Sequence, residues 1–353
     1  MAITGSNSRL VRTCRHVVVE QQEELSVSVP PVPLAVARAP QSSFGRVVRG
    51  LDPAQLSSAG CELKVSLSGL LSQYKVVVLR LDRPLSVDEM KEVASLFGEV
   101  KAGMARCEDG TVRKYLSYDH FGSPRVLQGT GIMEHRSGFV LRPEILRKLV
   151  NALTSSGGDS LRPFVYEGFH TDDSYTSAPA GVTMLHARAL PPSGGGDTLF
   201  LDMAGAFFQL AEVEPHTLAH LEGRCAEHAY NNKGAFPPRP ATSGGNEALV
   251  KPRHPILRRH HITGVPSLYW DLDRATGAVD GLGWAEGQAL LQRLQNKVEA
   301  TAPRYRHVWQ PHDVLVWDNA SVQHAVVGDF PVGEARTMWR MLLEGEPPQS
   351  WAR

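Results

Sequence analysis

The segment FHTDDSY places a histidine and a carboxylate two residues apart, at His170 and Asp172. On an extended strand, side chains two residues apart point to the same side, so the imidazole and the carboxylate can meet at one point. Two histidines and one carboxylate on one face of an octahedral ion leave the other positions open, and this ligand set suits iron(II) oxygenase chemistry. The second histidine must come from far along the chain, where VWDNASVQH offers His324. The pair alone is a weak signal, because the same spacing occurs in surface loops and around core histidines.

Two further segments carry side chains that can hold a carboxylate. GGGDTLF contains Thr198, and DFPVGEARTMWR contains Arg336 and Arg340. The planar guanidinium of arginine can grip a carboxylate with two parallel hydrogen bonds. Each residue also has a purely structural interpretation: Thr198 suits the start of a strand, and the two arginines suit surface positions. The glycines at 194–196 predict a turn before a strand, because no Lys-Ser/Thr follows them as in a phosphate-binding loop.

The order HTDDSY, GGDT and WDN…H…R, with comparable gaps, resembles the pattern of the taurine dioxygenase/2,4-dichlorophenoxyacetate dioxygenase (TauD/TfdA) family. The resemblance runs over about residues 44–341 and is most specific from Phe169 to Arg340. It implies a mainly β fold with flanking helices, a double-stranded β-helix or jelly roll, with the metal inside one open end. It also implies Fe(2+) as the metal, 2-oxoglutarate as cosubstrate and O2 as oxidant.

The resemblance assigns roles residue by residue. His170, Asp172 and His324 match the iron ligands of the family. Thr198 and Arg336 match the pair that holds the distal carboxylate of 2-oxoglutarate.

Three residues are candidates for contacting the substrate. Arg340 matches a family arginine that faces the substrate and can pair with a carboxylate or sulfonate. Tyr166 stands four residues before His170, where taurine-specific members carry asparagine, so the resemblance does not extend to taurine itself. Tyr175 either lines the substrate site or packs against a sheet.

The expected reaction is hydroxylation of a small, anionic organic substrate with release of succinate and CO2. Asp172 argues against a halogenase, which needs a small residue there to leave room for halide. The same iron core could instead desaturate or cyclise a biosynthetic intermediate, or hydroxylate a trimethylammonium acid. A binding protein without catalysis on a degenerate oxygenase fold is the alternative from another class.

Strand and helix signals place these motifs. Residues 74–81, YKVVVLRL, predict a strand because they are rich in β-branched side chains. A helix follows, with a capping box at Ser86 and Glu89 and an end at Gly98. Further strands are predicted at 182–189, 198–201, 268–271, 314–317 and 337–343, and further helices at 143–153, at 284–300 and after Asp202. This pattern indicates a β-barrel or sandwich supported by helices.

Several other residues are interpreted as structural or solvent-exposed and not as part of the site. His254, His260 and His261 stand in a Pro- and Arg-rich stretch and read as solvated loop residues. Arg188, Arg258 and Arg259 read as surface charge. Trp317 and Asn319 read as packing and turn residues beneath His324, although Asn319 could support the metal site.

Composition narrows the class of protein. The 353 residues include 42% hydrophobic and 21% charged residues, with 37 Lys+Arg and 37 Asp+Glu, so no basic excess points to nucleic acid. No apolar run approaches a membrane span. The four cysteines are spread without a CxxC pair, which indicates reduced thiols and no zinc site. The expected partner is a small-molecule substrate, with a homo-oligomer possible.

The ends of the chain predict tails. Residues 1–43 read as a disordered tail and linker, and their arginines and missing acids before Glu20 also suit a transit segment. The dioxygenase domain is expected at 44–345, with a C-terminal tail at 346–353. A cytoplasmic protein is expected if residues 1–43 are a simple tail, and a mitochondrial protein is the alternative if they are a transit segment.

Overall fold

The computed structural model describes residues 35–38, 44–53, 60–101, 119–120, 125–127, 130–138, 168–228, 252–272, 275–327, 329–330 and 334–351. The helix expected at 143–153, the tail before residue 35 and Tyr166 lie outside these residues. No helix in the described part of the chain is long and apolar enough to cross a membrane.

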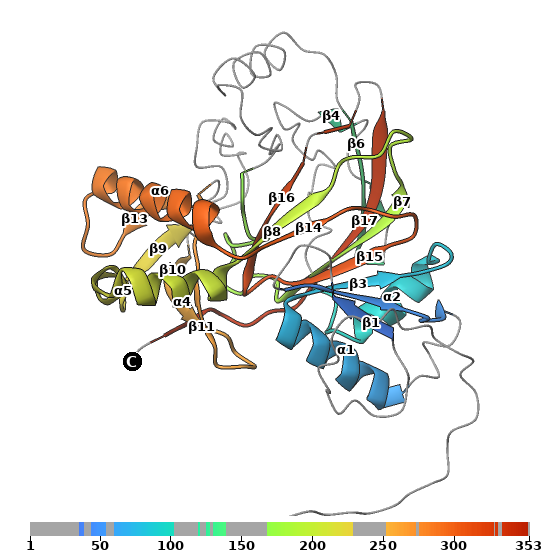
Figure 1. Cartoon of the computed structure of the whole chain (residues 1–353), viewed down its shortest axis with the longest axis horizontal. Coiled ribbons are helices and arrows are strands. Elements are labelled where there is room, and N and C mark those ends of the chain that lie inside the picture. The colour runs from blue at the N-terminus through green and yellow to red at the C-terminus, as the bar shows by residue number, and fades with distance from the viewer. Residues whose placement is uncertain are drawn as a thin grey trace, which may run out of the picture.

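A nine-stranded sheet forms the centre of the molecule (Figure 1). Its strand order is β1-β2-β3-β15-β7-β17-β6-β4, and β5 also pairs with β6. All neighbouring strands are antiparallel except β2 and β3, which are parallel. The strands are β1 (Ala35–Arg38), β2 (Arg46–Arg49), β3 (Val76–Arg80), β4 (Asp119–His120), β5 (Arg125–Leu127), β6 (Ile132–Gly138), β7 (Val182–Ala189), β15 (Val314–Asp318) and β17 (Ala335–Leu343).

A second sheet packs against one face of the first. It has the order β14 (Arg304–His307), β8 (Thr198–Asp202) and β16 (Val322–Val326), all antiparallel. Phe200 of β8 meets Trp317 of β15 edge to face, with ring centroids 5.5 Å apart. Both rings belong to a buried cluster that takes side chains from both sheets. The two sheets therefore form a sandwich, and this shared cluster is its interior.

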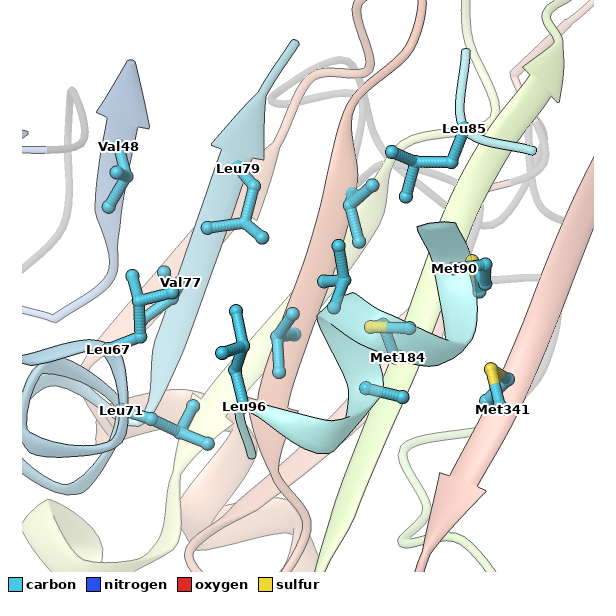
Figure 2. Close-up of a cluster of buried hydrophobic side chains, with 14 of the residues drawn as sticks. Val48, Leu67, Leu71, Val77, Leu79, Leu85, Met90, Leu96, Met184 and Met341 are labelled. Atoms are coloured by element: carbon cyan, nitrogen blue, oxygen red, sulfur yellow. The ribbon is translucent and has the colours of Figure 1, made fainter. Parts of the chain in front are cut away.

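Two helices cover the other face of the large sheet, which we call the outer face. They are α1 (Gly60–Tyr74) and α2 (Val87–Ser95). Figure 2 shows the apolar cluster between these helices and the sheet, with Leu67 of α1 and Met90 of α2 among its members. From the sheet come Met184 of β7 and Met341 of β17, both fully buried. Because neighbouring residues of a strand face opposite sides, one strand can serve the outer face and the interior together.

The remaining elements pack around a third cluster beside the sandwich (Figure 1). Trp270 is fully buried in it and donates through Nε1 to Gln295 of α6 at 2.7 Å. The elements are α4 (Met203–Val213), α5 (Pro215–Leu221), α6 (Trp284–Thr301), the sheet of β10 (Arg253–Pro255), β9 (Cys225–His228) and β13 (Ala275–Val279), and the sheet of β12 (Pro266–Leu268), β11 (Leu257–Arg259) and β18 (Gln349–Ser350).

Most local predictions are confirmed. The Ser86 and Glu89 capping box is present at the start of α2, and the Asp202 carboxylate accepts from the first amides of α4. The strand expected at 268–271 is wrong, because β12 spans Pro266–Leu268 and the buried residues 269–271 follow it outside any strand. The confirmed strands and helix are β3, β7, β8, β15, β17 and α6.

Regular structure extends beyond both expected domain boundaries. β1 lies before Phe44 and pairs with β2, so strand pairing begins inside the segment expected to be a tail. At the other end, β18 pairs with β11, and the Trp351 ring packs edge to face on Phe207 with centroids 5.0 Å apart. The aromatic contact and the strand pairing hold the chain in place after residue 345.

Candidate active site

A two-residue bridge joins the segment of His170 to strand β16. The His170 amide donates to the His324 carbonyl at 3.0 Å, and the His324 amide donates back to the His170 carbonyl at 2.8 Å. The ring centroids lie 4.2 Å apart. Backbone pairing thus brings together two histidines that are far apart in the sequence.

His170, Asp172 and His324 converge on one point. One ligand atom from each residue lies within 4.8 Å of the others, and all three residues are buried. His170 Nδ1 is 3.0 Å from the Gly168 carbonyl, which accepts its hydrogen and so leaves Nε2 as the ring nitrogen that could bind a metal ion. Two imidazoles and one carboxylate form the donor set of a non-haem iron(II) site with open positions. The residues present therefore fit such an ion.

Two neighbours act on the Asp172 carboxylate. The Thr183 hydroxyl of β7 donates to Oδ2 at 2.9 Å. Arg340 of β17 places Nη1 3.5 Å from Oδ1. The hydroxyl fixes the orientation of the carboxylate, and the guanidinium adds a positive charge beside His170, Asp172 and His324.

Asn319 fixes the backbone of Asp172. Its Oδ1 accepts from the Asp172 amide at 2.9 Å, and its Nδ2 donates to the carbonyls of Asp172 and Ala180 at 2.8 and 2.9 Å. The sequence suggested a turn residue that could support the site. The structure shows that the Asn319 side chain forms hydrogen bonds with both the amide and the carbonyl of Asp172 and so fixes its backbone.

The residue after the ligand adopts an uncommon conformation. Asp173 has φ of 61°, in the left-handed region. Its carboxylate pairs with Lys101, which also donates to the Ala178 carbonyl and to the Thr176 hydroxyl. These contacts hold the turn that follows Asp172, and nothing in the local sequence identified Lys101.

The pair expected to hold 2-oxoglutarate comes from opposite sheets. Thr198 begins β8 and is buried, and its Oγ1 accepts from the Trp309 indole at 3.2 Å. Arg336 is near the start of β17, also buried, and its Nη1 donates to the Gly196 carbonyl at 2.6 Å. Arg336 therefore reaches across the sandwich to the segment that leads into Thr198.

Gly196 is required where Arg336 passes. Its φ is +71°, and a Cβ there would lie 3.2 Å from the Phe330 ring and 3.3 Å from Arg336 Cδ. Its amide donates to Asp329, which pairs with Arg306, and Arg306 pairs in turn with Asp197. Ion pairs thus hold the glycine turn against the sandwich.

The two candidate tyrosines and the histidines expected in a solvated loop differ in how far the structure agrees with their predicted positions. Tyr175 is partly buried three residues after Asp172, and Tyr166 is outside the described residues. His261 is exposed as expected, but His254 and His260 are buried, which corrects the expectation of solvated loop residues.

The corrected residues have internal partners. His254 Nε2 lies 2.9 Å from the Ser174 carbonyl, and burial lowers the pKa of His254. His260 Nε2 is 3.0 Å from Asp318. Arg258 is buried with its guanidinium over the Tyr269 ring, so it is not surface charge.

Arg188 is also corrected, because its guanidinium lies 3.9 Å from the centre of the Trp339 ring and Nη1 donates to the Leu85 carbonyl. Arg259 is exposed, as expected.

Comparisons with known proteins identify the family of this chain. The family model described as "Taurine catabolism dioxygenase TauD, TfdA family" matches residues 35–342. An alpha-ketoglutarate-dependent sulfonate dioxygenase from Saccharomyces cerevisiae is 28% identical over 86% of this chain, and the match covers 66% of that longer protein, just under two thirds. An alpha-ketoglutarate-dependent 2,4-dichlorophenoxyacetate dioxygenase from Cupriavidus pinatubonensis is 28% identical over 72% of this chain and 79% of its own length. The crystal structure of a taurine dioxygenase from Burkholderia xenovorans matches the fold with a TM-score of 0.62 at 21% identity, covering 90% of this chain and 93% of that one.

Proposed function

This chain belongs to the TauD/TfdA family of alpha-ketoglutarate-dependent dioxygenases, and on that premise we propose that His170, Asp172 and His324 bind its iron(II). Enzymes of this family use iron(II), 2-oxoglutarate and dioxygen. The observation that carries the proposal is the meeting of three buried ligand atoms within 4.8 Å of one another. The two packed sheets around them support a further structural proposal, that the fold is a double-stranded β-helix, or jelly roll.

Bound iron(II) would supply the oxidation of a substrate by dioxygen, coupled to the decarboxylation of 2-oxoglutarate to succinate and CO2. The protein's own residues orient the reactants. Thr183 holds the Asp172 carboxylate by one hydrogen bond, and Asn319 holds its backbone by two. This preorganisation fixes where the metal can sit, so less is lost to reorganisation during turnover. A carboxylate at position 172 also leaves no room there for a halide.

Arg336 and Thr198 are proposed to bind the distal carboxylate of 2-oxoglutarate. A guanidinium has five N–H donors, and a carboxylate can accept two of them side by side. Burial in the sandwich removes competing water, which strengthens such a pair. With one end held there and the other at the metal, the cosubstrate has a single orientation.

Arg340 is proposed to select an anionic substrate. It lies on the same face of β17 as Arg336, since alternate residues of a strand share a face. Its Nη1 is 3.5 Å from the Asp172 carboxylate, and its side chain is 27% exposed to solvent. A partly exposed positive charge beside the metal cluster suits a carboxylate or sulfonate. Tyr175 and Tyr166 are the further proposed substrate contacts.

A substrate panel tests this proposal. Small sulfonates, phenoxyacetates, sulfate esters, a trimethylammonium acid and neutral amides of the same carbon skeletons would be compared by succinate release with iron(II) and ascorbate. We expect turnover of one anionic class and little turnover of its neutral amide. Arg340→Ala should raise the KM for the anion, whereas the exposed Arg259→Ala should not. Equal turnover of the anion and its amide would refute the selective role of Arg340.

The product mass identifies the reaction outcome. Hydroxylation adds one oxygen atom to the substrate, and desaturation or ring closure removes two hydrogen atoms. We expect the gain of oxygen for the proposed function.

A further inference from the structure

Trp309 touches the proposed cosubstrate site without being one of its ligands. It follows β14 and is buried, and its indole Nε1 is 3.2 Å from Thr198 Oγ1. An indole nitrogen can only donate, so the Thr198 oxygen must accept this bond. The chemistry of the indole therefore fixes the direction of this hydrogen bond.

A chain of buried side chains holds the Trp309 ring. It lies edge to face on His307, with centroids 4.5 Å apart at 81°. His307 Nε2 is 3.3 Å from Asp313, and Arg80 grips that carboxylate with two hydrogen bonds of 2.9 and 3.0 Å. Burial lowers the pKa of the His307 ring that lies under Trp309. The indole therefore has one well-defined position.

The contact determines what the Thr198 hydroxyl can do. A hydroxyl has one hydrogen to donate and two lone pairs that accept. One lone pair is used by Trp309, and the structure gives this hydroxyl no second partner among the residues that it describes. Its own hydrogen therefore remains for an acceptor that enters the site. Accepting a bond also polarises the hydroxyl and makes it a somewhat stronger donor.

We propose that Trp309 is a positioning residue for 2-oxoglutarate, which turns the Thr198 hydrogen toward the distal carboxylate of the cosubstrate by donating to the Thr198 oxygen. This inference rests on the proposed function, because it requires that carboxylate to lie beside Thr198. It explains why a threonine, which could equally accept from a ligand, acts here as a donor to an anion.

Ligand binding to the full-length protein tests the inference without turnover. N-Oxalylglycine, in which an N–H replaces a methylene of 2-oxoglutarate, would be titrated by calorimetry into protein loaded with manganese(II). We expect Trp309→Phe to weaken binding by about 2- to 12-fold, the range for one lost hydrogen bond. Thr198→Val should weaken binding at least as much, and the double variant should bind no more weakly than Thr198→Val alone.

Two controls separate positioning from general damage. N-Methyloxamate lacks the distal carboxylate of N-oxalylglycine, so Trp309→Phe should leave its affinity unchanged. Trp270→Phe removes another buried indole bond, to Gln295, away from Thr198. It should lower the Tm and leave the affinity for N-oxalylglycine unchanged.

The wild-type protein offers a second measurement that does not depend on how the variants fold. In zinc-loaded protein with 15N-labelled tryptophan, the indole signals from the six tryptophans can be followed. We expect N-oxalylglycine to shift the Trp309 signal, and N-methyloxamate to leave it in place.

Three outcomes would overturn the inference. N-Oxalylglycine affinity unaffected by Trp309→Phe, with Thr198→Val weakening it, would overturn the role of Trp309 alone. A Trp309→Phe effect that persists in full in the Thr198→Val background would show that Trp309 does not act through Thr198. Failure of wild-type protein to bind N-oxalylglycine would overturn the proposed cosubstrate site and this inference together.

Discussion

The two faces of the nine-stranded sheet carry residues with different roles, although the same strands form both faces. On β7, Met184 points to the outer face under α1 and α2, and the adjacent Thr183 points into the sandwich and bonds Asp172. On β17, Met341 packs in the outer cluster, and the adjacent Arg340 reaches the Asp172 carboxylate. The alternation of a strand thus separates residues that stabilise the fold from residues that perform chemistry, one position apart. Substitutions on the two faces should therefore be separable by measurement.

The largest effect is expected inside the sandwich at the metal cluster. Asp172→Ala removes the carboxylate ligand, so iron-dependent succinate release should fall by more than about 100-fold, beyond the cost of losing a group that merely supports a ligand. Iron content and succinate release after loading would be measured together. Normal succinate production by this variant would contradict the metal assignment.

The next effect is expected at Arg336 on the same interior face. Arg336→Ala would remove one partner of the proposed charge-assisted pair with 2-oxoglutarate in a buried site, at a cost of about 2–5 kcal/mol. The KM for 2-oxoglutarate should rise by about 30- to 5,000-fold. The exposed Arg304→Ala on β14 serves as the control and should leave this KM unchanged. An unchanged KM in Arg336→Ala would show that another residue holds the cosubstrate.

A substitution five residues along β17 should have the opposite profile. Met341 is fully buried on the outer face, so Met341→Ala should lower the free energy of unfolding by about 2–5 kcal/mol. The affinity for N-oxalylglycine should stay that of the wild type. Urea unfolding and calorimetry would measure the two quantities. A loss of ligand affinity comparable to that of Arg336→Ala would show that the two faces are not separable.

His186 offers a finer test, because it is a polar group among the apolar side chains of the outer face. Its Nε2 accepts from the Leu85 amide at 3.1 Å, and burial lowers the pKa of His186 from 6.5 to about 4. Between these two pKa values His186 is protonated in the unfolded chain but not in the folded protein. The free energy of unfolding therefore falls as the pH drops from 6.5 toward 4. The lost contribution is about 3 kcal/mol.

The pH test compares urea unfolding of wild type and His186→Gln at pH 7 and pH 5. The variant should lose less stability than the wild type over this interval, because it has no imidazole to protonate. An identical loss in both proteins would show that other groups cause the pH dependence. Ligand affinity at pH 7 should be the same in the two proteins.

The sequence predicted the parts of the site that local spacing encodes. The HxD spacing and the conformation of strands 182–189 and 314–317 could be read from the chain, and the family resemblance assigned the distant His324. The structure brings His170, Asp172 and His324 together. Helix α1 was not expected, although Leu63, Leu67 and Leu71 have helical spacing, because serine and glycine between them weaken the helix signal.

Contacts between distant segments could not be read in this way. The bond from Trp309 to Thr198 joins a residue after β14 to the start of β8, and only the pairing of these strands makes them neighbours. The burial of His254 and His260 likewise depends on which segments cover them. Residue type alone favoured solvent for both, since nothing in the local pattern marks a carbonyl or carboxylate partner.

The bridge between His170 and His324 has a consequence for the order of assembly. It joins residues separated by more than 150 positions, so closing this loop costs far more chain entropy than forming a helix or hairpin. We expect the proposed metal ligands to meet only when long-range pairs such as this one have formed. We expect a partly folded chain, which offers only the HxD pair, to bind iron more weakly than the completed fold with all three proposed ligands. Iron that binds only the completed fold would add its binding free energy to the stability of that fold.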